Sequence, residues 1–130
     1  MPSDYQTVLA IRGPRQSGKG SCLIAGGIAI ALQNPDRCVL YASPSSIQTK
    51  EAQARHGAAA PQNFIWSYVL LRVGIRFEQY VGDLKPTLIL LDEAQDMGFP
   101  GASQFAHRLS KKFKTSVWFT ENECDYREEA

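Results

Sequence analysis

Apolar and polar positions alternate along the chain in blocks, and several apolar blocks are short and end at a turn-forming or acidic residue. Such abrupt runs are typical of strands buried in a sheet. The run TLILL at 87–91 is the clearest because every residue after its threonine is aliphatic. The predicted strands are residues 7–11, 37–42, 87–91 and 116–119.

Longer segments between these runs carry a pattern that predicts helices. Residues 19–33 are rich in alanine and isoleucine and stop at an Asn-Pro pair, which ends helices. Residues 47–56 are polar and rich in alanine and glutamine, and residues 103–113 repeat apolar side chains with a helical period. The segment 64–80 has mixed apolar spacing, and we predict a helix there.

Strands that alternate with helices predict one α/β domain over residues 1–130. The expected architecture is a three-layer α/β/α sandwich around a mainly parallel sheet. Ligands of such folds bind at the carboxyl ends of the strands, so polar residues at those ends are candidates for a site. The acidic segment 121–130 is predicted to be a frayed tail.

Composition favours a soluble, cytoplasmic protein of viral or cellular origin with no membrane contact. Hydrophobic residues make up 44% of the chain, enough for a core, and the net charge of +1 gives no broad basic surface. The apolar run at 22–32 is too short to span a bilayer, and the N-terminus lacks a signal-peptide pattern. The cysteines are widely spaced, which excludes a CxxC metal motif.

The residues between the first predicted strand and the first predicted helix carry the strongest chemical signal. Residues 13–19 read GPRQSGK and match the pattern G-x-x-x-x-G-K in its strand–loop–helix context. Glycines let successive N–H groups point at an anion, and the following helix adds its positive dipole end. Lys19 would neutralise the β- and γ-phosphates of ATP or GTP. The predicted phosphate-binding residues are Gly13, Pro14, Arg15, Gln16, Ser17, Gly18, Lys19, Gly20 and Ser21.

One position departs from this pattern. A serine or threonine normally follows the lysine, and its hydroxyl holds Mg²⁺. Here Gly20 stands in that position and Ser21 comes next. We predict that Mg²⁺ binding persists with weaker protein ligation, because either Ser21 or a water takes the place of the missing hydroxyl.

Two carboxylates, Asp92 and Glu93, directly follow the buried run at 88–91. This segment resembles a Walker B strand, and the resemblance implies that its end lies beside the phosphate-binding loop. Asp92 is then suited to hold Mg²⁺, usually through water, and Glu93 is suited to polarise the attacking water as general base.

The stretch DEAQDM at 92–97 resembles motif II of superfamily 1 helicases. The resemblance implies a RecA-like core, ATP hydrolysis, and a role for Gln95 in coupling phosphate state to movement. Residues 116–123 resemble the next strand of that family, which leads to a glutamine that senses the γ-phosphate. Cys124 stands in that position here, and Thr120 or Asn122 is the alternative sensor.

The helicase resemblance also implies partners. Residues 41–46, YASPSS, resemble a loop that contacts a DNA backbone, although a capping turn for the next helix is the stronger interpretation. The family has a second RecA-like domain that supplies an arginine finger. We therefore expect a minimal or truncated module that binds DNA, single-stranded or duplex, together with a second RecA-like domain or another subunit.

Three other interpretations remain open. The run RQSGK at 15–19 and the segment 42–55 resemble large terminase subunits, the DNA-packaging ATPases of phages, which share the RecA-like core. Gly20 and Cys124 favour instead a regulatory nucleotide-binding module that hydrolyses slowly or not at all. The run GKGS at 18–21, with GFP at 98–100 and Gln104, resembles adenylate kinases. However, DEAQDM precedes Gly98 here, an extra methionine separates Asp96 from Gly98, and the strand RCVLYASP has no counterpart at that place in them.

Overall fold

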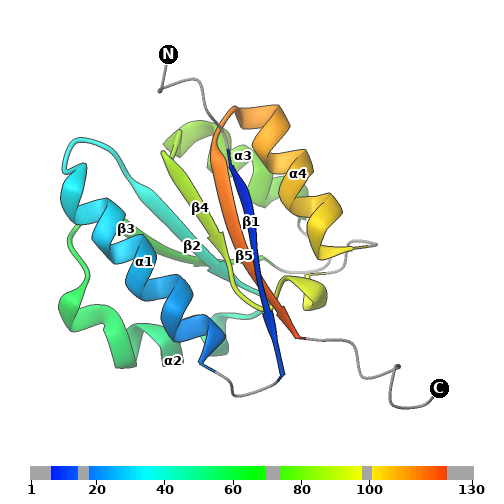
Figure 1. Cartoon of the computed structure of the whole chain (residues 1–130). Helices are drawn as coiled ribbons and strands as arrows, with labels where there is room; N and C mark the ends of the chain where they lie inside the picture. Colours follow the sequence, from blue (N-terminus) through cyan, green and yellow to red (C-terminus); the bar gives the residue numbers. More distant parts are fainter. Residues whose placement is uncertain (1–6, 15–17, 70–73, 98–100, 123–130) are drawn as a thin grey trace.

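The computed structural model describes residues 7–14, 18–69, 74–97 and 101–122 (Figure 1). Strands and helices alternate along most of the chain. The strands are β1 (Val8–Gly13), β2 (Val39–Ser43), β3 (Phe64–Tyr68), β4 (Leu88–Leu91) and β5 (Ser116–Asn122). The α-helices are α1 (Lys19–Gln33), α2 (Ser46–His56), α3 (Gly74–Leu84) and α4 (Ala102–Phe113). Short 3-10 helices cover Gly57–Ala59 and Ala94–Asp96.

These strands form one five-stranded sheet in the order β1-β5-β4-β2-β3. Every strand pair in the described residues is parallel, so the predicted α/β class and parallel sheet are confirmed. β5 is the last strand of the described residues, yet it pairs with β1 on one side and with β4 on the other (Figure 1). Its carboxyl end therefore lies between the ends of β1 and β4.

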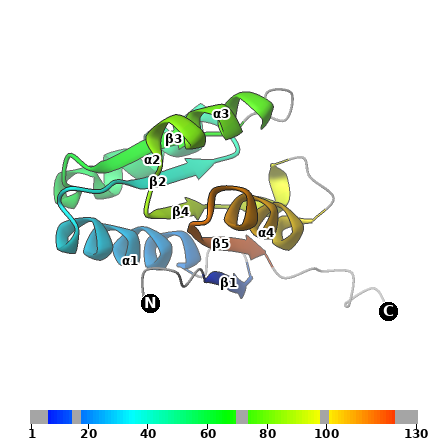
Figure 2. The same cartoon turned by 90° about the horizontal axis from the view of Figure 1, so that it is seen from above.

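Helices cover both faces of the sheet. Successive residues of a strand point to opposite faces, so each strand contributes side chains to both helical layers. On one face α1 packs against β2, β3 and β4, with Ala52 of α2 beside it. On the other face α3 and α4 pack against alternate residues of β2, β4 and β5. Figure 2 shows the sheet between these two helical layers. The helices shield the sheet so that its central strand β4 is buried along its whole length.

The close fit of α1 onto the sheet depends on one glycine. A Cβ at Gly27 would collide with the Cδ1 atom of Leu90 and would lie 3.2 Å from the ring of Phe64. Any larger residue would push α1 away from β4 and, with it, the helix start that carries Lys19. The glycine weakens the helix by about 1 kcal/mol relative to alanine, and the tight packing offsets that cost.

The helix predicted over 64–80 is wrong for Phe64–Tyr68 and confirmed for residues 74–80. Residues Phe64–Tyr68 form β3, which pairs with β2, and α3 begins only at Gly74. The aromatic side chains of the segment explain this outcome, since Trp66 packs 5.2 Å from Tyr41 and 4.7 Å from Phe64 between ring centroids. The contact between Tyr41 and Trp66 crosses from β2 to β3 and stabilises an extended conformation that the local spacing of apolar residues does not reveal.

The boundary of the predicted tail also needs correction. Glu121 and Asn122 are the last two residues of β5, and they lie in register with Arg12 and Gly13 of β1. The side chain of Arg12 forms an ion pair with Glu121, which ties the two strand ends together. Strand pairing therefore extends β5 beyond the apolar run that predicted it. The rest of the predicted tail, 123–130, lies outside the described residues.

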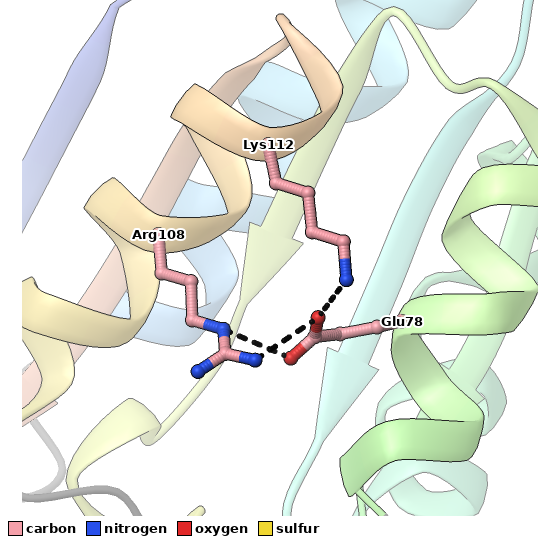
Figure 3. A network of polar contacts seen from close by, with 3 residues as sticks. All are labelled: Glu78, Arg108 and Lys112. Carbon is pink, nitrogen blue, oxygen red and sulfur yellow. Dashed lines mark hydrogen bonds and ion pairs between the residues drawn. The ribbon is translucent and has the colours of Figure 1, made fainter.

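A charged cluster joins α3 to α4 on the far face of the sheet (Figure 3). The carboxylate of Glu78, whose side chain is only 6% exposed, is 3.2 Å from the Nε atom of Arg108 and 2.8 Å from the Nζ atom of Lys112. Both cations come from α4 and are about half exposed. Burying a carboxylate is costly unless it is paired, so the two cations make this helix contact favourable.

We predict that replacing Arg108 and Lys112 together by alanine lowers the free energy of unfolding by about 2 kcal/mol, between typical values for exposed and buried pairs. Adding Glu78→Met to this double variant should restore most of the loss, because no uncompensated buried charge remains. Urea denaturation measures both effects. Lys111→Ala, on an exposed position of α4, is the matched control. A triple variant no more stable than the double variant would contradict this account.

Candidate functional site

A cavity of about 430 Å³ opens at the carboxyl edge of the sheet, between the start of α1 and the inward side of α2. Its size is within the range of small-molecule sites. The loop-side and strand-end residues that line it are Gly18, Lys19, Gly20, Ser21, Tyr41, Ser43, Asp92 and Glu93. The residues that α2 contributes are Gln48, Glu51, Ala52, Arg55 and His56. The cavity thus brings together the two motifs that the sequence places far apart.

The described part of the β1–α1 loop presents a lysine and a helix start to this cavity. Gly18 has a φ of 87°, a left-handed conformation that glycine adopts without strain, and no side chain caps the helix that begins at Lys19. The first N–H groups of such a helix are available to an anion, and the helix dipole favours negative charge there. Arg15, Gln16 and Ser17 lie outside the described residues.

Lys19 is buried, with 6% of its surface exposed, and its ammonium group has two partners. The Nζ atom donates to the carbonyl oxygen of Pro14 at 3.1 Å and to the Oδ1 atom of Asn122 at 2.7 Å. Asn122 reaches the lysine because it ends β5 directly beside Gly13 at the end of β1. An ammonium group held in this way is a fixed positive charge at the cavity wall.

Asp92 is held from both neighbouring strands. Its Oδ1 atom accepts a hydrogen bond from the hydroxyl of Thr120 on β5 at 2.7 Å. Its Oδ2 atom accepts one from the hydroxyl of Tyr41 on β2 at 2.8 Å. Burial, followed by the charge of Asp92 and the hydrogen bond to it, raises the pKa of Tyr41 well above its usual range. Tyr41 therefore stays protonated and acts as a hydrogen-bond donor.

The carboxylate of Asp92 fits the metal role that the sequence assigns to it. Each of its oxygens accepts one described hydroxyl and keeps a further lone pair. The neighbouring Gly20 has no side chain to cover the carboxylate, which lines the cavity. Mg²⁺ is commonly held by one or two carboxylates together with waters and phosphate oxygens. Among the described residues, no group of three or more acidic, histidine or cysteine side chains has metal-binding geometry.

Glu93 and Gln95 follow Asp92 at the carboxyl end of β4. Glu93 has a φ of 53°, an unfavourable left-handed conformation for a residue with a side chain, and its N–H donates to the Thr120 hydroxyl at 2.9 Å. The Nε2 atom of Gln95 donates to the Oε1 atom of Glu93 at 2.6 Å. The Oε1 atom of Gln95 accepts from the backbone N–H of Asn122 at 3.2 Å.

These contacts link the two motifs by a chain of hydrogen bonds. It runs from the Lys19 ammonium to the Asn122 side chain, and from the Asn122 backbone N–H through Gln95 to the Glu93 carboxylate. Sequence analysis gave Thr120 and Asn122 only as alternatives to the glutamine that senses the γ-phosphate. In the structure, Asn122 contacts Lys19 and Thr120 contacts Asp92. Asn122 therefore contacts both the lysine and the glutamine that is bonded to Glu93.

Ser21 lies in the same cavity but is less closely tied to Asp92. It is exposed, and its hydroxyl oxygen is 3.4 Å from the Nε2 atom of His56 at the end of α2. Its predicted metal role stays a prediction. At the end of β2, the hydroxyl of Ser45 caps α2 by accepting from the N–H of Gln48 at 3.2 Å. The interpretation of 41–46 as a capping turn is thus confirmed.

Sequence reasoning missed Tyr41 and His56 as parts of the site. The signal for Tyr41 is weak: it is the one residue with a hydroxyl inside the apolar run VLYA, where a buried phenol needs a partner. His56 reaches the cavity because the end of α2 lies beside the start of α1, next to Ser21. Neither position belongs to a recognisable motif, so their roles follow from the packing of the strands and helices.

No family model matches the chain, and no curated protein matches it significantly. Within the described ranges, none of the helices has both the length and the apolar character required to cross a membrane. The functional argument accordingly depends on the geometry of the cavity and on the residues that line it.

The raised pKa of Tyr41 predicts a pH dependence of stability. The phenol ionises near pH 10 in the unfolded chain and stays protonated in the folded one, so stability is lost as the pH rises above about 10. Between pH 10 and pH 11, the unfolding free energy of the wild type should fall by about 1 kcal/mol relative to Tyr41→Phe. Urea midpoints of both proteins at each pH measure this difference; a constant difference would disprove the assignment.

Proposed function

We propose that this chain is a P-loop nucleoside triphosphatase domain with a RecA-like core, which binds ATP at the β1–α1 loop and hydrolyses it. The observation that carries the proposal is the hydrogen-bond chain between Lys19 and Glu93 at the wall of a ligand-sized cavity. A fixed cation, a free helix start and a pair of carboxylates at one sheet edge suit a polyphosphate that reacts with water.

Each of these residues has a defined part in the proposed reaction. Lys19 and the N–H groups at the start of α1 bind the phosphate oxygens, and the ammonium exchanges Asn122 for a γ-phosphate oxygen. Glu93 orients a water whose oxygen attacks the γ-phosphorus, while the bond to the β-phosphate oxygen breaks. The water proton passes to the Glu93 carboxylate or to the released phosphate. Gln95 holds Glu93 in place and senses, through Asn122, whether Lys19 is engaged.

Magnesium fits this site as the usual companion of ATP. Asp92 would hold the ion, with waters and the Ser21 hydroxyl as further ligands, and Gly20 leaves the carboxylate open toward the cavity. When bound, Mg²⁺ neutralises charge on the phosphate oxygens. Thr120 and Tyr41 keep the carboxylate in one orientation, so little reorganisation is needed when the nucleotide arrives.

The proposed biological task is work on DNA, as in helicases or in the terminase motors that package phage DNA. The support is the sequence pattern of the two motifs, since the site chemistry is the same for both. The basic cluster of Lys111, Lys112 and Lys114 adds little to it. Lys112 is paired with Glu78, and the cluster precedes β5, at the sheet edge opposite the site. A second RecA-like domain or another subunit would complete such a motor.

One observation favours a second candidate, a regulatory module that binds nucleotide but hydrolyses it slowly. Lys19 and Glu93 are both engaged by neighbouring side chains, Asn122 and Gln95 respectively. If these bonds persist when ATP binds, Glu93 is unable to orient water. Nucleotide binding without turnover, unchanged by single-stranded DNA, would establish this second candidate in place of the first.

We predict that Lys19→Ala weakens ATP binding at least tenfold, because the phosphates lose their fixed cation, and that Glu93→Gln keeps binding within about threefold. Glu93→Gln should lower the rate of hydrolysis about a hundredfold or more, the usual contribution of a general base. Titration of a fluorescent ATP analogue and a phosphate-release assay measure the two effects.

Lys111→Ala and Asp83→Asn, both exposed and at the opposite sheet edge, are the matched controls for charge removal. Both should retain wild-type binding and turnover. Unchanged nucleotide affinity in Lys19→Ala would overturn the proposed function. Stimulation of turnover by single-stranded DNA, absent in Glu93→Gln, would support the link to DNA.

A further inference from the structure

Two positions from different elements converge on one oxygen atom of Asp92. The hydroxyl of Tyr41 lies 2.8 Å from the Oδ2 atom. A Cβ placed on Gly20 would lie 2.9 Å from the same Oδ2 atom and 3.3 Å from Oδ1. Carbon and carboxylate oxygen are not found this close, so a side chain at position 20 requires the carboxylate to move. Tyr41 in turn holds the carboxylate where it is.

Position 20 is also the place where phosphate-binding loops of this pattern carry a hydroxyl residue. Here the hydroxyl that meets the aspartate comes instead from β2, which pairs with β4. Tyr41 is able to reach Asp92 because it lies on the neighbouring strand, in register with Leu90. Its side chain is on the face of the sheet that α1 covers. A side chain at position 20 and the Tyr41 hydroxyl would therefore compete for the space around the same Asp92 oxygen.

We propose that Tyr41 is a positioning residue for the metal-binding carboxylate of Asp92, and that this arrangement requires a glycine at position 20, where a side chain would displace the carboxylate. The Tyr41 phenol and the Thr120 hydroxyl come from the two strands that flank β4. Each donates a hydrogen bond to a different carboxylate oxygen of Asp92. Asp92 lines the cavity, and its remaining lone pairs would be left for Mg²⁺ that accompanies the nucleotide. This inference rests on the proposed function for the metal, but the pairing of Tyr41 with Gly20 is a property of the ligand-free protein.

The ring of Tyr41 packs in the core, whereas its hydroxyl bonds Asp92, so the two contributions can be tested separately. Tyr41 is 1% exposed, and its ring packs against Phe64 and Trp66, with centroids 6.4 Å and 5.2 Å away. Tyr41→Phe keeps this packing and removes only the oxygen. The matched control is Tyr68→Phe, which removes a phenol oxygen from the exposed end of the neighbouring strand β3.

The first test is a double-mutant cycle on the ligand-free protein, read as the melting temperature. Gly20→Ser and Gly20→Ala should each lower it, because the added Cβ displaces a carboxylate that Tyr41 holds. In the Tyr41→Phe background the loss from Gly20→Ser should be at most half as large, because Asp92 can move and accept the serine hydroxyl. Gly20→Ala lacks that hydroxyl and should recover less. Additive effects in the cycle would overturn the pairing.

The second test measures how the affinity for a fluorescent ATP analogue depends on the Mg²⁺ concentration. Tyr41→Phe should raise the half-maximal Mg²⁺ concentration about tenfold and leave the affinity without Mg²⁺ within twofold, whereas Tyr68→Phe should change neither. Adding Gly20→Ser to Tyr41→Phe should recover part of the shift. A tenfold change corresponds to about 1.4 kcal/mol, close to the worth of one hydrogen bond to a charged group.

The outcomes separate this inference from the function on which it rests. If the wild type binds the analogue with a normal Mg²⁺ requirement and Tyr41→Phe has the same half-maximal concentration, Tyr41 has no positioning role and this inference alone fails. If the wild type binds no nucleotide, the proposed function fails and the metal role of Tyr41 fails with it. The melting-temperature cycle still decides whether Tyr41 and Gly20 share the Asp92 oxygen.

Discussion

The insertion of β5 between β1 and β4 is the constraint on which the rest of the site depends. Parallel pairing in fixed register places Asn122 beside Gly13 and brings Thr120 next to the end of β4. Two polar side chains of one strand thereby contact the lysine on one side and the aspartate on the other. Without β5 in this position, Lys19 and Asp92 would have no common neighbour, and the strand ends would carry unrelated polar groups.

The polar groups at this edge are held in place because each finds a partner. Among the described residues, no buried side-chain nitrogen or oxygen lacks a hydrogen bond. Lys19, Thr120 and Tyr41 are all buried, and an unpaired polar group in such a place costs about 1–3 kcal/mol. The cost of breaking any one contact therefore restrains the whole edge. A ligand that binds Lys19 must therefore replace the contacts that it removes.

Much of this edge could be predicted from the chain alone because its key residues are local. The segment 13–21 combines a strand end, glycines and a lysine, and the helix after it begins and ends where the apolar pattern indicates. Asp92 and Glu93 follow a run of aliphatic residues that has to be a buried strand. Such signals lie within a few neighbouring residues. The aromatic stretch 64–68 was misassigned because its extended form depends on β2 and on the ring of Tyr41.

The sequence by itself determined which segments are strands or helices for most of the chain, and that the lysine loop and the acidic pair both lie at strand carboxyl ends. Only the tertiary structure decided which strands are neighbours, and so which polar side chains meet. Tyr41 of β2 contacts Asp92 at the end of β4, and Asn122 at the end of β5 contacts Lys19 at the start of α1. The physical reason is that hydrophobic periodicity records which face of an element is buried. It carries no information on the order in which parallel strands pair, which is set by how all the helices and strands pack together.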